Sequence, residues 1–337
     1  SFYDNWTGSD NVEAEWDDEG NIVEHDIRKY LVHRERKSLG LRFDYNLGNT
    51  ELYTDLNYND RDDYENRYRQ RIKDLDEGEG SQEVRRQTKA GLPGNEYGRL
   101  EDQKLFSYKF GGTSLLDKLK LDYSFKISEA SELRPNERYL ALRLKKQTAV
   151  WNQSTEKPNF TFTNAIAADL NNSWDFRNLI EERRDTDEKA QSFKVDADYN
   201  FNDNLKLEAG LKISSRKKER RNEFYEFEPV DEDAFLADAF SNIVSQDKSE
   251  WLNDGDGTSY NSGSYVSREF LGNLDLSNTE LFERVIVEEE LAGNFKASED
   301  ITSFYGMASY DYSDQLLVVG GIRLERTSLY DLEARSY

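Results

Sequence analysis

The feature that most constrains this chain is a strict alternation of apolar and polar side chains. From Gln191 to Phe201 every second residue is apolar, and after Asn202-Asp203-Asn204 the pattern resumes and continues to Arg216. A period of two places the apolar and the polar residues on opposite faces of a β-strand. We therefore predict an antiparallel hairpin at residues 191–216, with a tight turn of Asn and Asp.

Three other segments repeat this pattern. Hairpins are predicted near residues 33–59, 105–128 and 303–327, each with two alternating runs around a short turn. All four prolines and all five tryptophans lie outside the four hairpins. Because proline cannot donate a hydrogen bond to a neighbouring strand, its position supports this assignment.

Long polar segments separate the hairpins. They lie near residues 60–102, 129–189 and 217–299, and we interpret them as loops, with extension of the flanking strands into their ends as the alternative. The acidic segment 1–24 is interpreted as a loop or as the end of a preceding strand.

Two helices are expected inside these loops. A short one is predicted around residues 174–182. A second one is predicted at residues 232–246, where Phe235, Phe240 and Val244 share one face with Leu236 and Ile243 at helical spacing.

The composition shows where the apolar residues are used. Only 36% of the chain is hydrophobic and 34% is charged, whereas globular domains are usually nearer half apolar. The 20 Tyr, 18 Phe and 5 Trp are nevertheless too many for a disordered chain. We infer that the apolar side chains are concentrated on one thin face of a sheet.

Charge and residue usage argue against several functions. With 45 basic and 68 acidic residues the net charge is −23, which argues against nucleic acid as a partner. The chain has no cysteine and two histidines, which excludes thiolate metal sites, thiol nucleophiles and most histidine chemistry. Acidic surface patches suit either divalent cations or solvated loops, and we expect no specific metal site, cofactor or catalytic residue. Carboxylates are abundant, but no pair is set apart by its spacing or surroundings, so an enzyme is not expected.

Short links at one end of the hairpins and long loops at the other favour a transmembrane β-barrel. In such barrels the periplasmic turns are short and the extracellular loops are long. Aromatic residues near the strand ends suit an interfacial girdle; these are Tyr45, Tyr58, Tyr123, Phe125, Tyr199, Phe201, Tyr310 and Tyr312. A soluble sheet protein shows the same alternation with its polar face in water, and stays open as an alternative.

Three stretches resemble the barrel of TonB-dependent outer-membrane receptors. They are residues 34–47, residues 207–218 and residues 304–327. Within the last, Gly321-Ile322-Arg323-Leu324-Glu325-Arg326-Thr327 is similar to that family's Gly-x-Arg-x-Glu-x-Thr strand. The matches lie on strands throughout residues 31–330, and their order and spacing carry the resemblance.

The resemblance implies an all-β, antiparallel, 22-stranded barrel in the outer membrane of a Gram-negative bacterium. It further implies an N-terminal plug and uptake of a scarce nutrient, such as a siderophore, vitamin, oligosaccharide or peptide. The implied partners are outer-membrane lipid, the TonB energising complex through the plug, and a surface lipoprotein or other outer-membrane subunits. This chain shows no plug and no terminal aromatic strand, so we expect it to be a segment of a larger barrel.

Candidate site residues follow from the barrel interpretation. The polar phase of the strands is expected to line the lumen, either contacting ligand or pairing across strands. These residues are Arg42, Asp44, Asp55, Lys120, Asp122, Lys194, Asp196, Asp198, Lys206, Glu208, Arg323 and Glu325. Trp151, Trp174 and Trp251 are candidates for ligand contact from extracellular loops, with anchoring of their own loops as the alternative.

Two further segments are open to both a ligand-binding and a purely structural interpretation. Asn253–Gly257 resembles part of a calcium loop but lacks the later acidic ligands, which favours a flexible turn. Arg216–Arg221 is basic in an acidic chain and suits anionic lipopolysaccharide, or a solvated strand end.

Three functions remain open at this point. The first is nutrient uptake by a TonB-dependent receptor, and the second is a structural or accessory barrel subunit of a larger outer-membrane complex. The third is a soluble, secreted β-rich binding protein. The third requires Phe193, Leu207, Tyr123 and Ile322 to pack in a protein core, with the opposite face open to water.

Overall fold

A computed structural model describes the chain except for residues 74, 76–81, 246–259, 261–262 and 333–337. The described residues form an all-β protein built on one 11-stranded sheet, in which every neighbouring pair is antiparallel. Two small two-stranded sheets and a few short helices lie at one end of it. Among the described residues no helix is long and apolar enough to cross a membrane.

Most strands of the large sheet are long. Its members are β1 (Phe2–Trp16), β2 (Ile22–Asn46), β3 (Thr50–Lys73), β4 (Gln82–Ala90), β5 (Arg99–Leu116), β6 (Leu119–Gln147), β9 (Asp175–Asn202), β10 (Leu205–Pro229), β13 (Phe282–Ile286), β14 (Phe295–Ser313) and β15 (Leu316–Leu332). The small sheets pair β7 (Ala149–Trp151) with β8 (Phe160–Phe162) and β11 (Ile243–Ser245) with β12 (Ser264–Val266). The helices are η1 (Pro93–Asn95), η2 (Ala165–Ala167), α1 (Glu232–Ser241), α2 (Arg268–Asn273) and α3 (Glu288–Leu291).

The strand order in the large sheet is β1-β2-β3-β4-β6-β9-β10-β14-β15, with β5 also between β3 and β6 and β13 paired with β10. Strands β4 and β5 both lie between β3 and β6. Strand β5 pairs with the start of β6 and of β3, and β4 pairs with the end of β3 and the end of β6. The four predicted hairpins are confirmed as the pairs β2–β3, β5–β6, β9–β10 and β14–β15.

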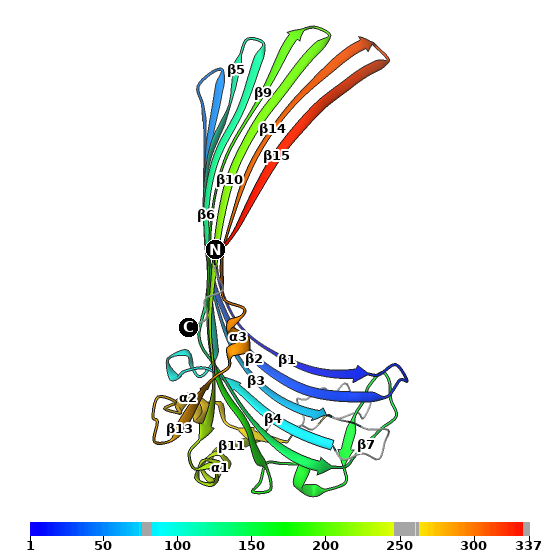
Figure 1. Ribbon diagram of the computed structural model, residues 1–337, viewed down its shortest axis with the longest axis vertical. Coiled ribbons are helices and arrows are strands. Elements are labelled where there is room, and N and C mark those ends of the chain that lie inside the picture. Colours follow the sequence, from blue (N-terminus) through cyan, green and yellow to red (C-terminus); the bar gives the residue numbers. More distant parts are fainter. Residues whose placement is uncertain (74, 76–81, 246–259, 261–262, 333–337) are drawn as a thin grey trace.

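The sheet has two ends of different character (Figure 1). Four tight turns lie together at one end, and the helices and small sheets lie at the other. We call the strand parts nearest the turns the turn half; they are residues 39–58, 105–127, 191–213 and 303–325. The rest of the sheet, with the segments that connect its strands there, is the loop half.

The predicted loops contain much more strand than expected. Strand β3 continues to Lys73, β6 to Gln147 and β10 to Pro229, and β9 begins at Asp175. Segment 1–24, interpreted mainly as a loop, contains β1 and the start of β2. The apolar alternation does not predict these extensions, because charged residues occupy both faces in β6, β9 and β10, and Asn66 and Gln70 interrupt the apolar face of β3. Pro135 lies within β6, at a break in its pairing with β9 between Arg134 and Glu137.

The helix predictions were right once and wrong once. The segment 174–182 is not a helix but lies at the start of β9. Its side chains alternate as in a strand: Leu179 lies on the face that packs against the covering loops, and Ile180 lies on the other face. Helix α1 begins where predicted, with Asp231 accepting a hydrogen bond from the Ala234 N–H at 2.9 Å. It ends at Ser241, and Ile243 and Val244 instead pair with β12.

The main hydrophobic core lies in the loop half. On the sheet side it contains Leu140, Leu142, Leu179, Phe227 and neighbouring residues. Against them pack residues from the connecting segments, which are Ala167, Leu170, Trp174, Phe235, Ala239, Val266, Leu271 and Leu276. The connecting segments are therefore folded onto one face of the sheet rather than projecting freely from it.

Candidate functional site

The candidate site is the polar face of the sheet. The register aligns the predicted lumen residues of neighbouring strands, so that Arg42 lies opposite Asp55 and Asp122 lies opposite Asp196. Because residues directly opposite each other in a ladder share a face, the predicted set lies on one surface. This surface continues from the turn half into the loop half.

In the turn half most of the charges on this face lie in ion pairs. Lys120 lies 2.6 Å from Asp122, and Lys194 lies 2.7 Å from Asp196. The remaining pairs are Arg42 with Asp44 and Asp55, Lys206 with Asp198 and Glu208, and Arg323 with Glu325. Every predicted lumen residue thus has an ion-pair partner on this face. This agrees with the alternative that these residues pair with one another rather than contact a ligand.

Tyrosines packed over glycines stiffen the same face. Tyr305 lies opposite Gly210 and Tyr53 lies opposite Gly111. A Cβ at Gly210 would fall 2.2 Å from a ring carbon of Tyr305, so only glycine leaves room for the ring. The Tyr305 hydroxyl donates to Asp196 at 3.0 Å, which ties β14 to β9 across β10.

A large hollow lies where the two halves meet. Its volume is about 850 Å³, and residues of β1, β2, β3, β5, β6, β9 and β10 line it. Arg36, Arg61 and Lys218 contribute positive charge to its wall, while Glu132 and Glu188 contribute negative charge. A second cavity of about 370 Å³ between β6, β9, β10 and β14 extends the polar surface. The hollow is large enough for a small-molecule ligand.

An ionic network crosses the face beyond this hollow. The Lys89 Nζ lies 2.7 Å from both Glu65 and Glu137, and Arg99 lies 3.3 Å from Glu65. Burial opposes ionisation of Glu137, but the charges of Lys89 and Arg99 outweigh it and lower its pKa to about 2. Glu137 is therefore charged at neutral pH, and the network joins β3, β4, β5 and β6.

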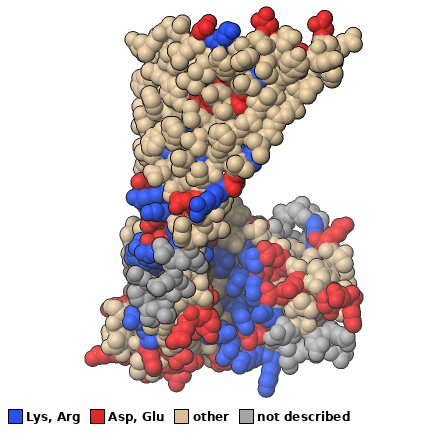
Figure 2. Space-filling view, turned by 45° about the horizontal axis from the view of Figure 1, so that its top comes forward, with Lys and Arg blue, Asp and Glu red and all other residues tan. Residues whose placement is uncertain are grey.

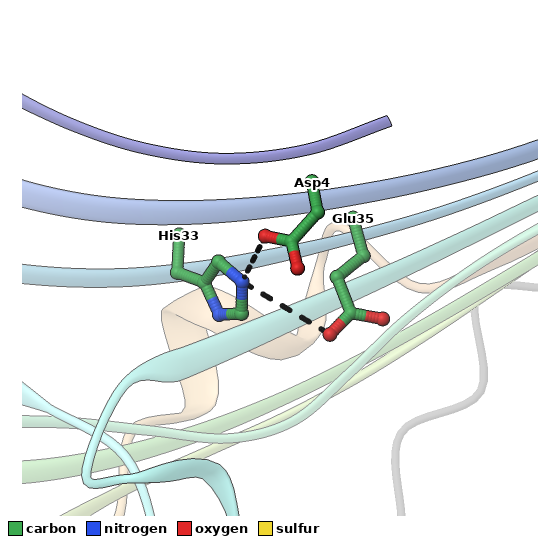
Figure 3. A group of neighbouring side chains, drawn as sticks. All are labelled: Asp4, His33 and Glu35. Carbon is green, nitrogen blue, oxygen red and sulfur yellow. Dashed lines mark hydrogen bonds and ion pairs between the residues drawn. The ribbon is translucent and has the colours of Figure 1, made fainter. Parts of the chain in front are cut away.

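One group of side chains on the opposite face has the composition of a metal site (Figure 3). The His33 Nε2 lies 2.9 Å from an Asp4 oxygen and 4.0 Å from a Glu35 oxygen. The His33 ring is also stacked between Trp6, at 4.2 Å, and Tyr64, at 5.6 Å. Hydrogen bonding and stacking account for this arrangement, so we assign no metal to it.

Sequence reasoning missed the contact between His33 and Asp4. Its only signal is the pairing of β1 with β2, in which Asp4 lies opposite Glu35 and Trp6 lies opposite His33. The second acidic group, Asp60 with Asp62 and Asp102, also arises only from strand register. The first group could be found only by knowing that residues 2–16 form a strand, and the second only by knowing the register of β3 with β5.

The predicted ligand-contact tryptophans lie in different surroundings. Trp174 is 1% exposed and donates from Nε1 to the carbonyls of Ile166 and Asp169, so it anchors its loop and is closed to ligand in this conformation. Trp151 is half-buried, with its ring edge-on to Trp16 at 5.6 Å. Trp251 and the segment Asn253–Gly257 lie outside the described residues.

The basic segment 216–221 lies on β10 with acidic neighbours. Arg221 is 3.0 Å from Asp185 and Arg216 is 3.4 Å from Glu188. Strand β9 therefore neutralises part of the positive charge expected to attract lipopolysaccharide, that of Arg216 and Arg221.

Comparison with known proteins gave no match: no family model fits the chain, and neither the curated proteins nor the solved structures include one that is significantly similar.

Proposed function

We propose that this sheet is part of an outer-membrane β-barrel, with its apolar face toward lipid and its polar face toward a lumen. We propose that the protein is a TonB-dependent receptor, which takes up a scarce nutrient through that lumen. The single observation that carries the proposal is the exposed apolar face of the turn half. The polar hollow and the register of the strands support it.

The apolar face is continuous across eight strands. One of its rows runs from Tyr45 and Leu52 through Gly112, Tyr123, Val195 and Leu211 to Phe304 and Leu324. Phe193 is 43% exposed and Ile322 is 66% exposed, with Leu207 also exposed. Soluble monomers rarely leave apolar patches of more than a few hundred Å² uncovered. The exposure of these residues weighs against the soluble binding protein.

The register is staggered in the way that a barrel requires. The row named above begins beside the first turn, yet in the last hairpin it lies far from the turn that follows Ser313. Each hairpin is thus displaced along the strand direction relative to the one before it. Closing a sheet into a barrel requires tilted strands with such a stagger.

The two outer edges of the sheet favour additional strands. Within the described residues, β1 pairs only with β2, and β15 pairs only with β14. An uncovered edge exposes a row of unpaired N–H and C=O groups, and a closed barrel removes it. We propose that further strands complete the barrel, and that a plug region links it to the TonB energising complex.

A structural or accessory role in a larger outer-membrane complex is the second candidate. It is favoured by the ion pairing of all the predicted lumen residues in the turn half, which engages these twelve charges within the sheet itself rather than with a ligand. In that case a surface lipoprotein or another outer-membrane subunit would contact the loop half.

Membrane insertion of the full-length protein tests the proposal. The protein is folded from urea in the presence of phosphatidylcholine vesicles and floated through a density gradient. We expect it to float with the vesicles after a carbonate wash and to resist protease in the turn half. A protein that remains folded, monomeric and detergent-free in buffer would contradict the proposal. Nutrient-dependent growth that is lost when the energising complex is deleted would then separate uptake from an accessory role.

A further inference from the structure

The loop half contains an array of basic residues on its polar face. Neighbouring strands place Arg71, Arg85 and Arg143 in one row across β3, β4 and β6. The next row contains Arg28 and Arg69, and the row after it Arg67 and Lys89. Strands in a sheet lie about 4.8 Å apart, so these cations form a compact group. In Figure 2 Lys and Arg gather in a band over the lower half of the molecule.

The carboxylates near this array are already occupied. Asp26 accepts from Arg71 at 2.8 Å and from Arg28 at 2.6 Å. Glu24 pairs with Arg71 at 2.9 Å, and Glu83 pairs with Arg85. Since Glu65 and Glu137 hold Lys89, none of these acidic groups is left for the remaining arginines.

Within this array, three guanidinium groups have no close carboxylate partner among the described residues. Arg67 donates to the side chain of Gln87 and lies over the rings of Tyr30 and Tyr139, at 6.0 and 5.8 Å. Arg69 comes no closer than 4.0 Å to Asp26. Arg143 makes no hydrogen bond or ion pair within the described part of the chain, and its Nε is buried.

This arrangement is electrostatically unfavourable without a counterion. The three arginines are half-buried, and two of them belong to a run of alternate arginines on β3. Burial, together with the charges of Arg67 and Arg71, lowers the pKa of Arg69 to about 10. The chain as a whole has a net charge of −23, so the overall composition does not explain a cluster of positive charge. A bound anion would remove the mutual repulsion.

We propose that the array formed by Arg67, Arg69 and Arg143 binds a ligand with several phosphate or sulfate groups. The guanidinium fork matches the oxygens of these groups and binds them in a bidentate manner. Three forks on two strands, separated by β4, suit several anionic groups on one molecule better than a single monoanion. The inference deepens the proposed function, on which it rests, by naming the substrate class as an oligoanion.

Calorimetry with inositol hexakisphosphate tests this inference. The full-length protein in detergent is titrated at low salt, and the triple variant Arg67→Gln/Arg69→Gln/Arg143→Gln is compared with it. The control is Arg42→Gln/Arg184→Gln/Arg323→Gln, which removes the same charge from three ion-paired arginines. We expect the first variant to weaken binding by about 100-fold and the control by less than about 3-fold.

The outcomes separate the inference from a general charge effect. Equal losses in the two triple variants, or no binding to the unaltered protein at low salt, would overturn it. If the first variant does not fold, Arg143→Gln replaces it, with an expected loss of about 10-fold. A heparin hexasaccharide in place of the inositol phosphate distinguishes sulfate from phosphate ligands.

The inference and the proposed function can fail separately. Anion binding in a protein that does not insert into vesicles would overturn the membrane proposal and leave the arginine array supported. Insertion into vesicles without anion binding would support the membrane proposal and overturn the anion site at the arginine array.

Discussion

The turn half and the loop half use the same face of one sheet in opposite ways. In the loop half this face is covered by the chain itself, and Leu142 and Leu179 are 1% and 0% exposed. In the turn half the same face has no cover among the described residues, and Phe193 and Ile322 are exposed. The space-filling view shows few charged groups on the visible surface of the turn half and many on the loop half (Figure 2).

The difference shows that the environment of a strand is not set by its alternation alone. Both halves place apolar residues on this face, but only the loop half has connecting segments rich enough in apolar residues to cover it, such as those with Trp174, Phe235 and Leu271. The turn half is connected by tight turns that can cover nothing. Its apolar face therefore requires a cover from outside the chain, which we propose is lipid.

Removing the largest buried side chain should disrupt the loop half alone. Trp174→Ala deletes a side chain that packs in the core and stacks on Arg86 at 5.4 Å. We expect a loss of about 3–5 kcal/mol in the stability of the covering segments. Hydrogen exchange should accelerate near residues 160–180 and 264–282, with no change in the turn half.

The matched control is Trp6→Ala, because Trp6 is exposed and stacks only on one face of His33. Its expected cost is about 1 kcal/mol or less. Faster exchange throughout the four hairpins in Trp174→Ala would show that the two halves are one cooperative unit, and would break the comparison.

A charge on the apolar face should distinguish lipid from water as its surroundings. Leu211→Lys places an ammonium group in the middle of that face, whereas Ser214→Lys on the same strand places one on the polar face. In vesicles we expect Leu211→Lys to lower the free energy of unfolding by about 2–4 kcal/mol. Ser214→Lys should change it little. Urea titrations of vesicle-bound protein measure both, and equal small effects would favour an aqueous environment.

The loop half should lose its cover in acid. His25 donates from Nε2 to the Pro158 carbonyl at 3.0 Å, and burial lowers its pKa from 6.5 to about 4. As the pH falls, the unfolded chain takes up this proton first, so stability decreases between about pH 6.5 and pH 4 and is constant above. The full decrease is roughly 3 kcal/mol.

The variant His25→Asn isolates this dependence from that of the carboxylates. It should be less stable at pH 7 but should lack the additional decrease between pH 6.5 and pH 4. Tryptophan fluorescence of the loop half, followed by urea titration at each pH, provides the measurement. Parallel pH profiles for the two proteins would show that the His25 contact does not hold the segment containing Pro158 on the sheet.

The smallest effect is expected for the ion pairs of the turn half. Lys194 is 54% exposed and pairs with Asp196 along its own strand, and such pairs contribute about 1 kcal/mol or less. Lys194→Met should therefore leave stability within about 1 kcal/mol. A larger loss would indicate that the polar face is drier than an open lumen.

The sequence predicts the turn half better than the loop half for a physical reason. The period of two is local, so the hairpins at 191–216 and 303–327 can be identified from neighbouring residues alone. In the loop half, strand segments such as residues 216–228 of β10 are charged on both faces, and the covering residues come from distant segments. The array of Arg67, Arg69 and Arg143 exists only because β4 aligns β3 with β6, and the contact of Asp4 with His33 depends on β1.

Single-cysteine labelling tests the central claim most directly. The chain has no cysteine, so Leu207→Cys and Glu208→Cys, or Ile322→Cys and Arg323→Cys, place one probe on each face at adjacent positions. An environment-sensitive fluorophore is attached at each site, and brominated lipids are used as quenchers in vesicles. The account predicts strong quenching at positions 207 and 322 and little at 208 and 323. Equal quenching on both faces, or none at 207 and 322, would contradict it.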